Sequence, residues 1–565
     1  MKLVHGRLSA VATAGIALAL SVSCSSGKAP LTAGGAAPKS AAPAAQRVLN
    51  VYSGASGQFT QNFNPIGVGI TPLNGTYGVI YEPLMFFNQA RADDVQPLLA
   101  TGYEFGDNGR SLTFAIRQGV TWHDGQPFTT DDVVFNFTYR QTNKDLNTAQ
   151  PFSLVTSVAK LDDTHVKVTF SEPVYTWLWQ IAGQTWMVPK HIWEKITSPN
   201  KETNPAPVGT GPFMFGTFTA QSYTFKKNPH YWEPDKPKIA GLRYFSYNTG
   251  DAAVSALAAG QLDWSGLFIP DPQAQYVSKD PDHNKFLNES FLYVTNLIPN
   301  LTKAPLDDLA VRQAVNVALD REKIIKLAFA GLGTMPSPLE LALPVYKDYV
   351  SPKYATAALD YNPDQARQIL ESAGYAKGAD GYYEKDGKRL SITCHVITGW
   401  NDYISTMQIV KQELKDVGIE FKTKEVSYNA FINIQQKGDF EMVIWNGWGG
   451  PSPYFMYNNI LNSESIPPNN QNMARWRNTQ VDAALKAIAA IPPENVDAIK
   501  QEIFKIQDQL MAELPYIPVQ QSSSLAEFRT VNATGWPTED NPYALALPFS
   551  IPDNGIIAKN LVPTP

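Results

Sequence analysis

Residues 112–137 read LTFAIRQGVTWHDGQPFTTDDVVFNF and carry three structural signals in succession. The β-branched and aromatic residues of Leu112–Arg117 predict a strand. Asp124-Gly125 is a turn pair, typical of a sharp change of chain direction. Thr129 precedes Asp132 by three positions, which is the spacing of a capping box, and an apolar helical face follows. The segment therefore predicts a strand, a turn and a capped helix within a mixed α/β fold.

The same signals recur along the rest of the chain. Runs rich in β-branched and aromatic residues predict further strands at residues 47–51, 165–170, 223–227, 242–247 and 390–397. Asn362-Pro363 supplies an N-cap and a first-turn proline, and Gly374 stands where a C-terminal glycine belongs. Asp307 or Asp308 is expected to begin another helix. No sequence repeat and no second low-complexity linker interrupts this pattern, so we expect one multi-lobed α/β unit.

The N-terminus has the organisation of a secretory signal. Basic residues stand before an apolar stretch from Leu8 to Val22, which is too short to span a membrane comfortably. Small residues then lead to Cys24, a pattern that resembles the site where bacterial lipoproteins are cut and acylated. We expect residues 1–23 to be a signal peptide, Cys24 to carry a lipid, and residues 24–47, rich in Ala, Pro, Gly and Ser, to form a flexible tether. Cleavage nearby with plain secretion is the alternative.

Composition sets further limits on the function. The 565 residues are 44% hydrophobic, which is enough to build more than one compact lobe. The formal net charge of −6 is spread along the chain without a block of like charges, so a nucleic-acid partner is not expected. Cys394 lies in an apolar segment and is expected to be a buried thiol without a disulfide partner.

Catalytic and metal-binding motifs are missing from the sequence. No two of the seven histidines stand at a metal-ligand spacing such as HExxH. No GxSxG elbow, phosphate-binding loop, GxGxxG or CxxC occurs. Paired acids such as Asp131-Asp132 are typical of helix starts. We therefore expect no enzyme activity, no cofactor and no metal. An extracellular hydrolase is the remote alternative, because a sequence cannot reveal two acids facing each other across a cleft.

The opening stretch also resembles the signature of the oligopeptide- and dipeptide-binding class of ABC-importer solute-binding proteins, extracellular solute-binding protein family 5. Further blocks of the sequence agree with this family in the same order: Tyr81–Leu84, Val208–Phe213 with Asn228–Trp232, Val311–Arg321, Tyr361–Ala366 with Ala373–Tyr375, and Leu514–Pro518. The resemblance covers essentially the whole chain after the predicted tether.

This resemblance implies a periplasmic-binding-protein-like α/β fold of three domains, in which two lobes close like a hinged clamp on a buried ligand. The implied bounds are 48–76, 208–297 and 514–565 for domain I, 77–207 for the inserted domain II, and 298–513 for domain III. The implied partners are the permease subunits of an ABC importer in the membrane with their cytoplasmic ATPases. The receptor is expected to be a monomer, anchored by Cys24 to the periplasmic side of the cell membrane.

One set of candidate ligand-binding residues lies in domain III. In the peptide-binding branch of the family, a Gly-Trp pair faces the cleft, and an acid three residues later pairs with the α-ammonium group of the ligand. Gly447-Trp448 resembles the pair, whereas Pro451 stands in the place of the acid. Core packing is the alternative role for Trp445 and Trp448. The candidates in this lobe are Trp400, Tyr428, Trp445, Asn446, Gly447 and Trp448.

A second set lies in the polar, Gly-rich loop that follows the first strand. Family members use this strand exit to contact the ligand. The candidates here are Tyr52, Gln58, Phe59 and Asn62. Amide side chains can donate and accept hydrogen bonds at once, which suits peptide groups and sugar hydroxyls alike.

We therefore expect a transport receptor that captures oligopeptides. A β-linked oligosaccharide is the alternative ligand, because a buried ammonium group without a counter-ion is unfavourable by several kcal/mol and aromatic rings can stack on sugars. A nickel ligand is not expected, because the sequence has no cluster of histidines or acids.

Overall fold

The computed structural model describes residues 47–54, 57–67, 71–91, 94–143, 145–146, 151–289, 293–447, 450–467, 471–521 and 524–565. The predicted signal peptide, Cys24 and nearly all of the predicted tether lie outside these residues. None of the helices within the described ranges has the length and apolar character needed to cross a membrane.

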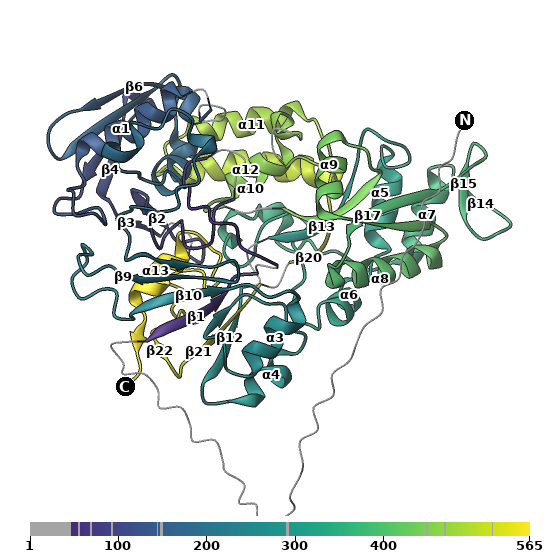
Figure 1. Ribbon diagram of the computed structural model, residues 1–565. Helices are drawn as coiled ribbons and strands as arrows, with labels where there is room; N and C mark the ends of the chain where they lie inside the picture. Colours follow the sequence, from purple (N-terminus) through teal and green to yellow (C-terminus); the bar gives the residue numbers. More distant parts are fainter. Residues whose placement is uncertain are drawn as a thin grey trace, which may run out of the picture. The chain divides into compact units, whose positions relative to one another are not determined.

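A seven-stranded sheet collects strands from three separate stretches of the chain (Figure 1). Central β1 pairs in parallel with β10 and β11, and the remaining pairs are antiparallel. The order across the sheet is β12 (Asn284–Asn288), β21 (Leu525–Arg529), β11 (Trp264–Ser265), β1 (Val48–Tyr52), β10 (Gly241–Phe245), β9 (Ser222–Lys227) and β8 (Phe213–Phe218). With α3 (Gly250–Ala258), α4 (Pro272–Gln275) and α13 (Asp553–Asn560), this sheet is called the first lobe below.

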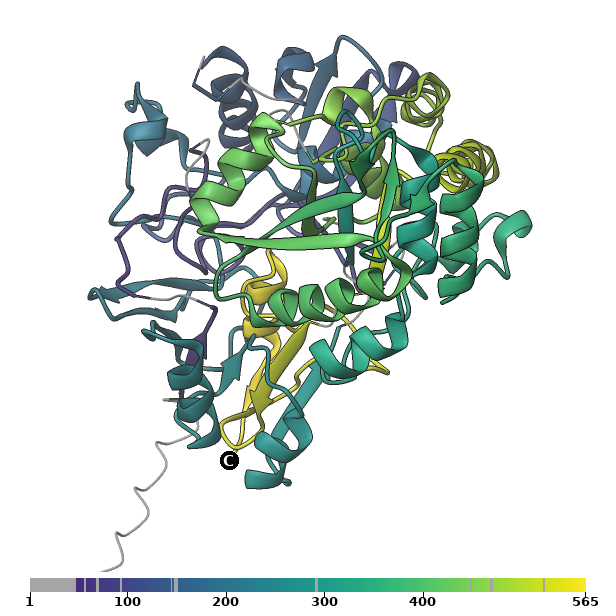
Figure 2. The ribbon, with the colours of Figure 1, turned by 90° about the vertical axis from the view of Figure 1, so that its right-hand side faces the viewer.

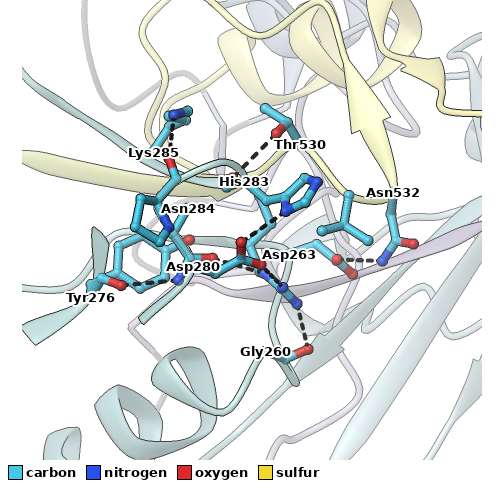
Figure 3. Close-up of polar contacts among 12 residues, drawn as sticks. Gly260, Asp263, Tyr276, Asp280, His283, Asn284, Lys285, Thr530 and Asn532 are labelled. Carbon is cyan, nitrogen blue, oxygen red and sulfur yellow. Dashed lines mark hydrogen bonds and ion pairs between the residues drawn. The ribbon is translucent and has the colours of Figure 1, made fainter. Parts of the chain in front are cut away.

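A polar network fastens the C-terminal stretch to the rest of the first lobe (Figure 3). Asp263 accepts hydrogen bonds from the Asn532 amide at 2.7 Å and from the Asn50 backbone N–H at 2.8 Å. The Arg529 guanidinium donates to the side chains of Asn284 at 2.9 Å and Asp280 at 3.0 Å. Because buried polar groups are stable only when they are paired, these contacts fix residues distant in sequence in one arrangement.

A five-stranded sheet forms the centre of the second lobe, with helices on both sides (Figures 1 and 2). Its order is β18 (Glu420–Val426), β17 (Ser391–Ile397), β19 (Met442–Asn446), β13 (Val294–Pro299) and β20 (Ile517–Gln521). On β19, Met442 and Ile444 pack into one apolar cluster, whereas Val443 and Trp445 pack into the other. Side chains alternate between the faces of a strand, so a sheet covered on both faces requires this continuous apolar run.

The two helical layers of the second lobe come from different parts of the chain. One layer contains α5 (Leu309–Val317), α6 (Arg321–Ala328), α7 (Pro363–Ser372) and α8 (Asn401–Val417). The other contains α9 (Tyr428–Lys437), α10 (Pro453–Leu461), α11 (Thr479–Ala489) and α12 (Val496–Glu513). A small sheet of β14 (Ala376–Lys377), β15 (Tyr383–Lys385) and β16 (Lys388–Arg389) extends this lobe.

The third unit, called the inserted lobe, consists of the elements between Met85 and Trp193. Its four-stranded antiparallel sheet has the order β4 (Ala100–Gly106), β5 (Ser111–Ile116), β7 (His165–Phe170) and β6 (Val155–Lys160). The lobe also contains β2 (Met85–Phe87), β3 (Val95–Pro97), α1 (Thr130–Thr142) and α2 (Lys190–Trp193). Elsewhere, β22 (Ala533–Thr534) pairs with β23 (Val562–Pro563) near the C-terminus.

The strand, turn and helix predicted from residues 112–137 are confirmed. Helix α1 has a capping box, in which the Asp132 carboxylate accepts from the Thr129 backbone N–H at 2.9 Å. The six predicted strands correspond to β1, β5, β7, β9, β10 and β17, within one or two residues at most ends. The predicted caps at Asp308 and Asn362 accept hydrogen bonds from α5 and α7, and Gly374 follows α7 with a φ of 86°.

Three of the sequence blocks meet around the buried carboxyl of Glu82. Its oxygens accept hydrogen bonds from the Tyr231 hydroxyl at 2.6 Å, the Thr210 hydroxyl at 2.9 Å and the Trp232 indole at 3.1 Å. Glycine is required at position 209 because a Cβ there would overlap the carbonyl oxygen of Ile80. The glycine and the buried acid of these blocks therefore have structural roles, and their contacts join segments on either side of the inserted lobe.

Several other carboxyl groups are buried in the two large lobes and form no ion pair with another described residue. Glu527 is fully buried on β21 and accepts from the Ser265 hydroxyl at 2.6 Å and the Leu267 backbone N–H at 3.0 Å. Burial raises the pKa of Glu527 to about 8. Burial likewise raises the pKa of Glu289 and of Glu340 to about 8. These groups are held in their neutral form at pH values where an exposed glutamate is ionised.

We predict that Glu527→Gln makes the protein less sensitive to alkaline pH. The folded chain binds a proton at Glu527 that the unfolded chain loses above about pH 4.5, so wild-type stability falls as the pH rises from there to about 8. Glutamine imitates the neutral acid and removes this contribution. Thermal unfolding should be measured from pH 5 to 8.5. The midpoint of the variant should rise relative to that of the wild type as the pH rises.

The exposed Glu172→Gln variant is the matched control for the loss of one carboxylate. Its difference from the wild type should stay nearly constant over the same pH range. A Glu527→Gln difference that is equally independent of pH would contradict the assignment of a neutral buried acid.

Candidate functional site

Two connections join the first and second lobes, one from β12 to β13 and one from β20 to β21. The described residues at the ends of these two connections are hydrogen-bonded to each other. The Ser524 carbonyl accepts from the Glu289 backbone N–H at 2.8 Å, and the Ser524 and Tyr293 hydroxyls lie 2.9 Å apart. Clefts between lobes are common ligand sites, so the residues beside these connections are candidates for ligand contact.

Two predicted residues of the second lobe, Asn446 and Gly447, lie beside this pair of connections, which is called the crossing below. Asn446 is the last residue of β19 and is paired with Thr295 of β13. The Gly447 backbone N–H donates to the Val294 carbonyl at 3.2 Å. Val294 and Thr295 are the first residues of β13 after the connection. The end of β19 therefore lies directly beside the point where the chain enters the second lobe.

Trp400 and Trp445 form an aromatic stack with Phe431. The Trp400 and Trp445 ring centroids are 5.4 Å apart with an interplanar angle of 17°. Trp445 also stacks with Phe431 at 5.2 Å and 30°. Trp445 is only 8% exposed, so it belongs mainly to the apolar core, whereas Trp400 is half-buried. Of the two tryptophans, Trp400 has the side chain surface that a ligand could contact.

The start of α8 brings an acid to the same place, which the sequence analysis did not select. Asp402 follows Trp400 by two residues and is half-buried, and burial raises its pKa. Among the described residues, no lysine, arginine or histidine forms an ion pair with Asp402. Burial raises the pKa of Tyr293, and the nearby Asp402 carboxylate adds to this rise. A half-buried acid without a cation beside Trp400 could have been proposed only once the fold brought α8 to the crossing.

The predicted residues of the first lobe lie around the exit of β1. Tyr52 is 4% exposed and packs edge-to-face with Tyr247 at 5.6 Å, in the same apolar cluster as Leu525. Leu525 is the first residue of β21, so Tyr52 also lies beside one of the two connections. Tyr247 was not predicted, because nothing in its local sequence distinguishes it from other tyrosines.

The loop after β1 is fixed to neighbouring segments. These contacts decide which of its side chains remain available to a ligand. Phe59 packs edge-to-face against Tyr223 at 4.8 Å, and its backbone N–H donates to Ala220 at 2.7 Å. Asn62 accepts through its side chain from the Asn64 backbone N–H at 3.0 Å. Gln58 is exposed. The loop thus presents Gln58 to solvent and uses Phe59 at least partly for packing.

Three predicted site residues cannot be placed. Trp448 and Cys24 lie outside the described residues, and the side chain of Tyr428 does as well, although its backbone begins α9. The structure therefore brings together Trp400, Trp445, Asn446 and Gly447 in one group and Tyr52, Phe59 and Asn62 near another strand end. Whether these residues bind a ligand stays a prediction.

His123, which stands in the opening sequence block, has a structural role. Its Nδ1 accepts from the Gly209 backbone N–H at 3.2 Å, so Nε2 carries the proton that is donated to the Gly211 carbonyl at 3.0 Å. Burial lowers the pKa of His123 to about 4, which keeps the ring neutral. Among the described residues, no group of three or more His, Cys, Asp or Glu side chains could hold a metal ion.

Comparisons with known proteins agree with this architecture. Residues 94–468 match the family model described as bacterial extracellular solute-binding proteins, family 5 Middle. A Brucella ovis protein named as an ABC transporter peptide-binding protein is 29% identical over 522 residues, covering 88% of this chain and 91% of that one. The glutathione-binding protein GsiB of Salmonella paratyphi A is 27% identical over 456 residues, covering 78% of this chain and 83% of that one.

Solved structures extend the likeness to the three-dimensional fold. The periplasmic oligopeptide-binding protein of a Thermotoga maritima oligopeptide ABC transporter has a TM-score of 0.83 and 25% identity, covering 92% of this chain and 99% of that one. A structure of the same protein with mannohexaose bound has a TM-score of 0.79 and 26% identity, covering 92% and 98% of the two chains. With a family match over residues 94–468 and this fold, the chain belongs to the bacterial extracellular solute-binding proteins of family 5.

Proposed function

We propose that the chain is the substrate-binding receptor of an ABC importer and that it captures oligopeptides outside the cytoplasm. The observation that carries this proposal is the pair of bonded connections between two large lobes, with the predicted ligand residues at the strand ends beside them. Family membership and the printed names of the Brucella relatives support the transport role. Its partners are then the permease subunits and ATPases of the importer, and the receptor works as a monomer.

A β-linked oligosaccharide is the second candidate ligand. The Thermotoga neighbour that is named as an oligopeptide-binding protein was solved with mannohexaose, so one fold of this kind accommodates a sugar. In this chain, Trp400 offers a half-buried aromatic ring at the crossing, and Pro451 stands where an acid would pair with a peptide ammonium. Both features suit a ligand without a free ammonium group. A peptide with a blocked amino group meets the same requirement.

Domain closure is the proposed mechanism of capture. The first lobe, the inserted lobe and the second lobe are proposed to correspond to domains I, II and III. The predicted bounds place both residues 294–297 and residues 514–521 in domain I. Because β13 and β20 both belong to the five-stranded sheet, we propose that the domain changes lie between 289 and 294 and between 521 and 525. Each strand then stays with its own sheet during closure.

We predict that the ligand lacks a buried free ammonium group and that Trp400→Ala weakens its binding by about 2 kcal/mol. Calorimetry with free tri- to pentapeptides, their N-acetylated forms and β-linked di- to tetrasaccharides should find the tightest binding among the compounds that lack an ammonium group. Tyr382→Ala, which removes a half-buried aromatic ring beside the small sheet of the second lobe, is the matched control and should leave the affinity unchanged.

Asp402→Asn provides the opposite test. Tight binding of free peptides that is lost on N-acetylation and also lost in Asp402→Asn would show that Asp402 replaces the missing acid as the counter-ion. That result would contradict the prediction that the ligand lacks a buried ammonium group, while leaving the receptor role intact.

We predict that ligand binding shifts the receptor towards a more compact closed form. Small-angle scattering of the full chain should show a smaller radius of gyration at saturating ligand than without ligand. Tryptophan fluorescence should change along the same titration curve. A ligand that binds by calorimetry but leaves the radius of gyration of an open receptor unchanged would contradict the closure mechanism.

We predict that Cys24 anchors the receptor to the membrane and that the tether is not needed for folding. Cys24→Ala should release the protein into the soluble fraction with unchanged ligand affinity, because residues 25–47 contain almost no apolar side chains to bury. Fractionation and detergent partitioning measure the release. Unchanged partitioning, or loss of the folded state, would argue against this anchor.

A further inference from the structure

A cavity of about 280 Å³ lies between the inserted lobe and the second lobe. One wall comes from the inserted lobe and includes Phe87 of β2, Tyr103 of β4 and Trp179. The opposite wall comes from the second lobe and includes Phe455 of α10 and Ile503 of α12. A space of this size is many times larger than a single water molecule needs, so it is more than a packing defect.

The two walls touch at one edge of this interlobe pocket. The rings of Trp179 and Phe455 pack edge-to-face with their centroids 5.1 Å apart. Residues Tyr175–Trp177 of the inserted lobe also lie next to α11. The pocket therefore exists only while the inserted lobe and the second lobe are in contact.

Charge decides what this pocket can hold. Among the described residues that line the pocket, Asp94 alone carries a formal charge at neutral pH. Its carboxylate already accepts from Asn88 at 2.9 Å and from Gln96 at 3.1 Å, and Arg91 lies 4.0 Å away. A charged group placed against the aromatic walls would lose part of its hydration, and Asp94 is already paired. An alkyl or aromatic group would instead bury apolar surface against aromatic rings.

The pocket is also lined by the stretch of chain that follows β19. Pro451, the residue in the place of the acid, lines the pocket. The Gly450 carbonyl just before it accepts from the Tyr346 hydroxyl at 2.5 Å, which fixes the start of this wall. Gly447 is four residues earlier and is bonded to β13 beside the lobe connection. A ligand that lies along the end of β19 would thus have its next group close to the pocket.

We propose that this interlobe pocket is a subsite for an uncharged apolar group, alkyl or aromatic, carried at one end of the ligand. The proposal rests on the receptor function proposed above and names the chemistry of one part of its ligand. Because both lobes supply the walls, a group bound there stabilises the arrangement in which they touch. Occupation of the pocket therefore favours the closed receptor through mass action.

The test uses the full chain and the neutral fluorescent probe N-phenyl-1-naphthylamine. The probe should brighten on binding to the wild type. Ile491→Trp and Val95→Trp each fill the pocket from a different lobe and should weaken probe binding about tenfold or more, since a bulky ring takes the place of the buried probe. Ile369→Trp, which adds the same ring to a half-buried site on α7 outside the pocket, should leave probe binding unchanged.

A second arm compares an N-acetyl tetrapeptide with its N-benzoyl form by calorimetry, so that both compounds lack the ammonium group. The benzoyl group should improve binding to the wild type, and Ile491→Trp should remove this gain while preserving the affinity for an N-acetyl tetrapeptide. If probe and N-benzoyl peptide bind Ile491→Trp, Val95→Trp and Ile369→Trp equally well, the subsite proposal is overturned. If no peptide or saccharide binds the wild type but the probe still reports the pocket, the receptor function fails and the apolar pocket stands.

A third measurement needs no variant and so does not depend on variant folding. An N-(4-benzoylbenzoyl) tetrapeptide is photo-crosslinked to the wild type, and the modified positions are mapped by mass spectrometry. Crosslinks on both walls, such as Trp179 and Phe455, support the subsite. Crosslinks confined to other surfaces overturn it.

Discussion

The pair of hydrogen-bonded connections between the first and second lobes is the constraint on which the rest of the structure depends. Ser524 holds both connections, since its carbonyl accepts from the Glu289 N–H at 2.8 Å and its hydroxyl lies 2.9 Å from that of Tyr293. Two short connections at one edge leave few backbone torsions in which the lobes can rotate against each other. For the domain closure proposed above, this restricts the motion to opening and closing about this edge, and residues next to it would move least.

The first lobe is stiffened beside this edge by carboxyl groups that accept backbone N–H groups. Glu289 accepts from Ala546 at 2.7 Å, and Asp553 accepts from Leu545 at 2.8 Å, so the C-terminal segment is fastened to the end of β12. Burial raises the pKa of Glu289 to about 8 and of Asp553 to about 7. At pH 7 Glu289 is mainly neutral and Asp553 is about half neutral, so both join segments with little added negative charge.

The sequence predicted local structure well because its signals are local. The capping box of Thr129 and Asp132 and the N-cap of Asn362 act within one helical turn, so they survive any tertiary context. The site could be predicted only as two groups of residues. Trp400 and Trp445 are far apart in sequence, and only the fold shows that one is core and the other half-exposed. Asp402 was missed for the same reason, since an acid in the first turn of a helix is ordinary.

The segment from Met442 to Phe455 connects three features that otherwise lie apart. Its strand β19 alternates between the two cores of the second lobe, which holds it rigidly. Its next residues, Asn446 and Gly447, are bonded beside the first residues of β13 at the lobe connection. Its end, at Phe455, meets Trp179 of the inserted lobe. A ligand that contacts the middle of this segment is therefore within a few residues of both the lobe connection and the contact between lobes. For the closure proposed above, binding energy gained there would act directly on the lobes, without a long pathway through the protein.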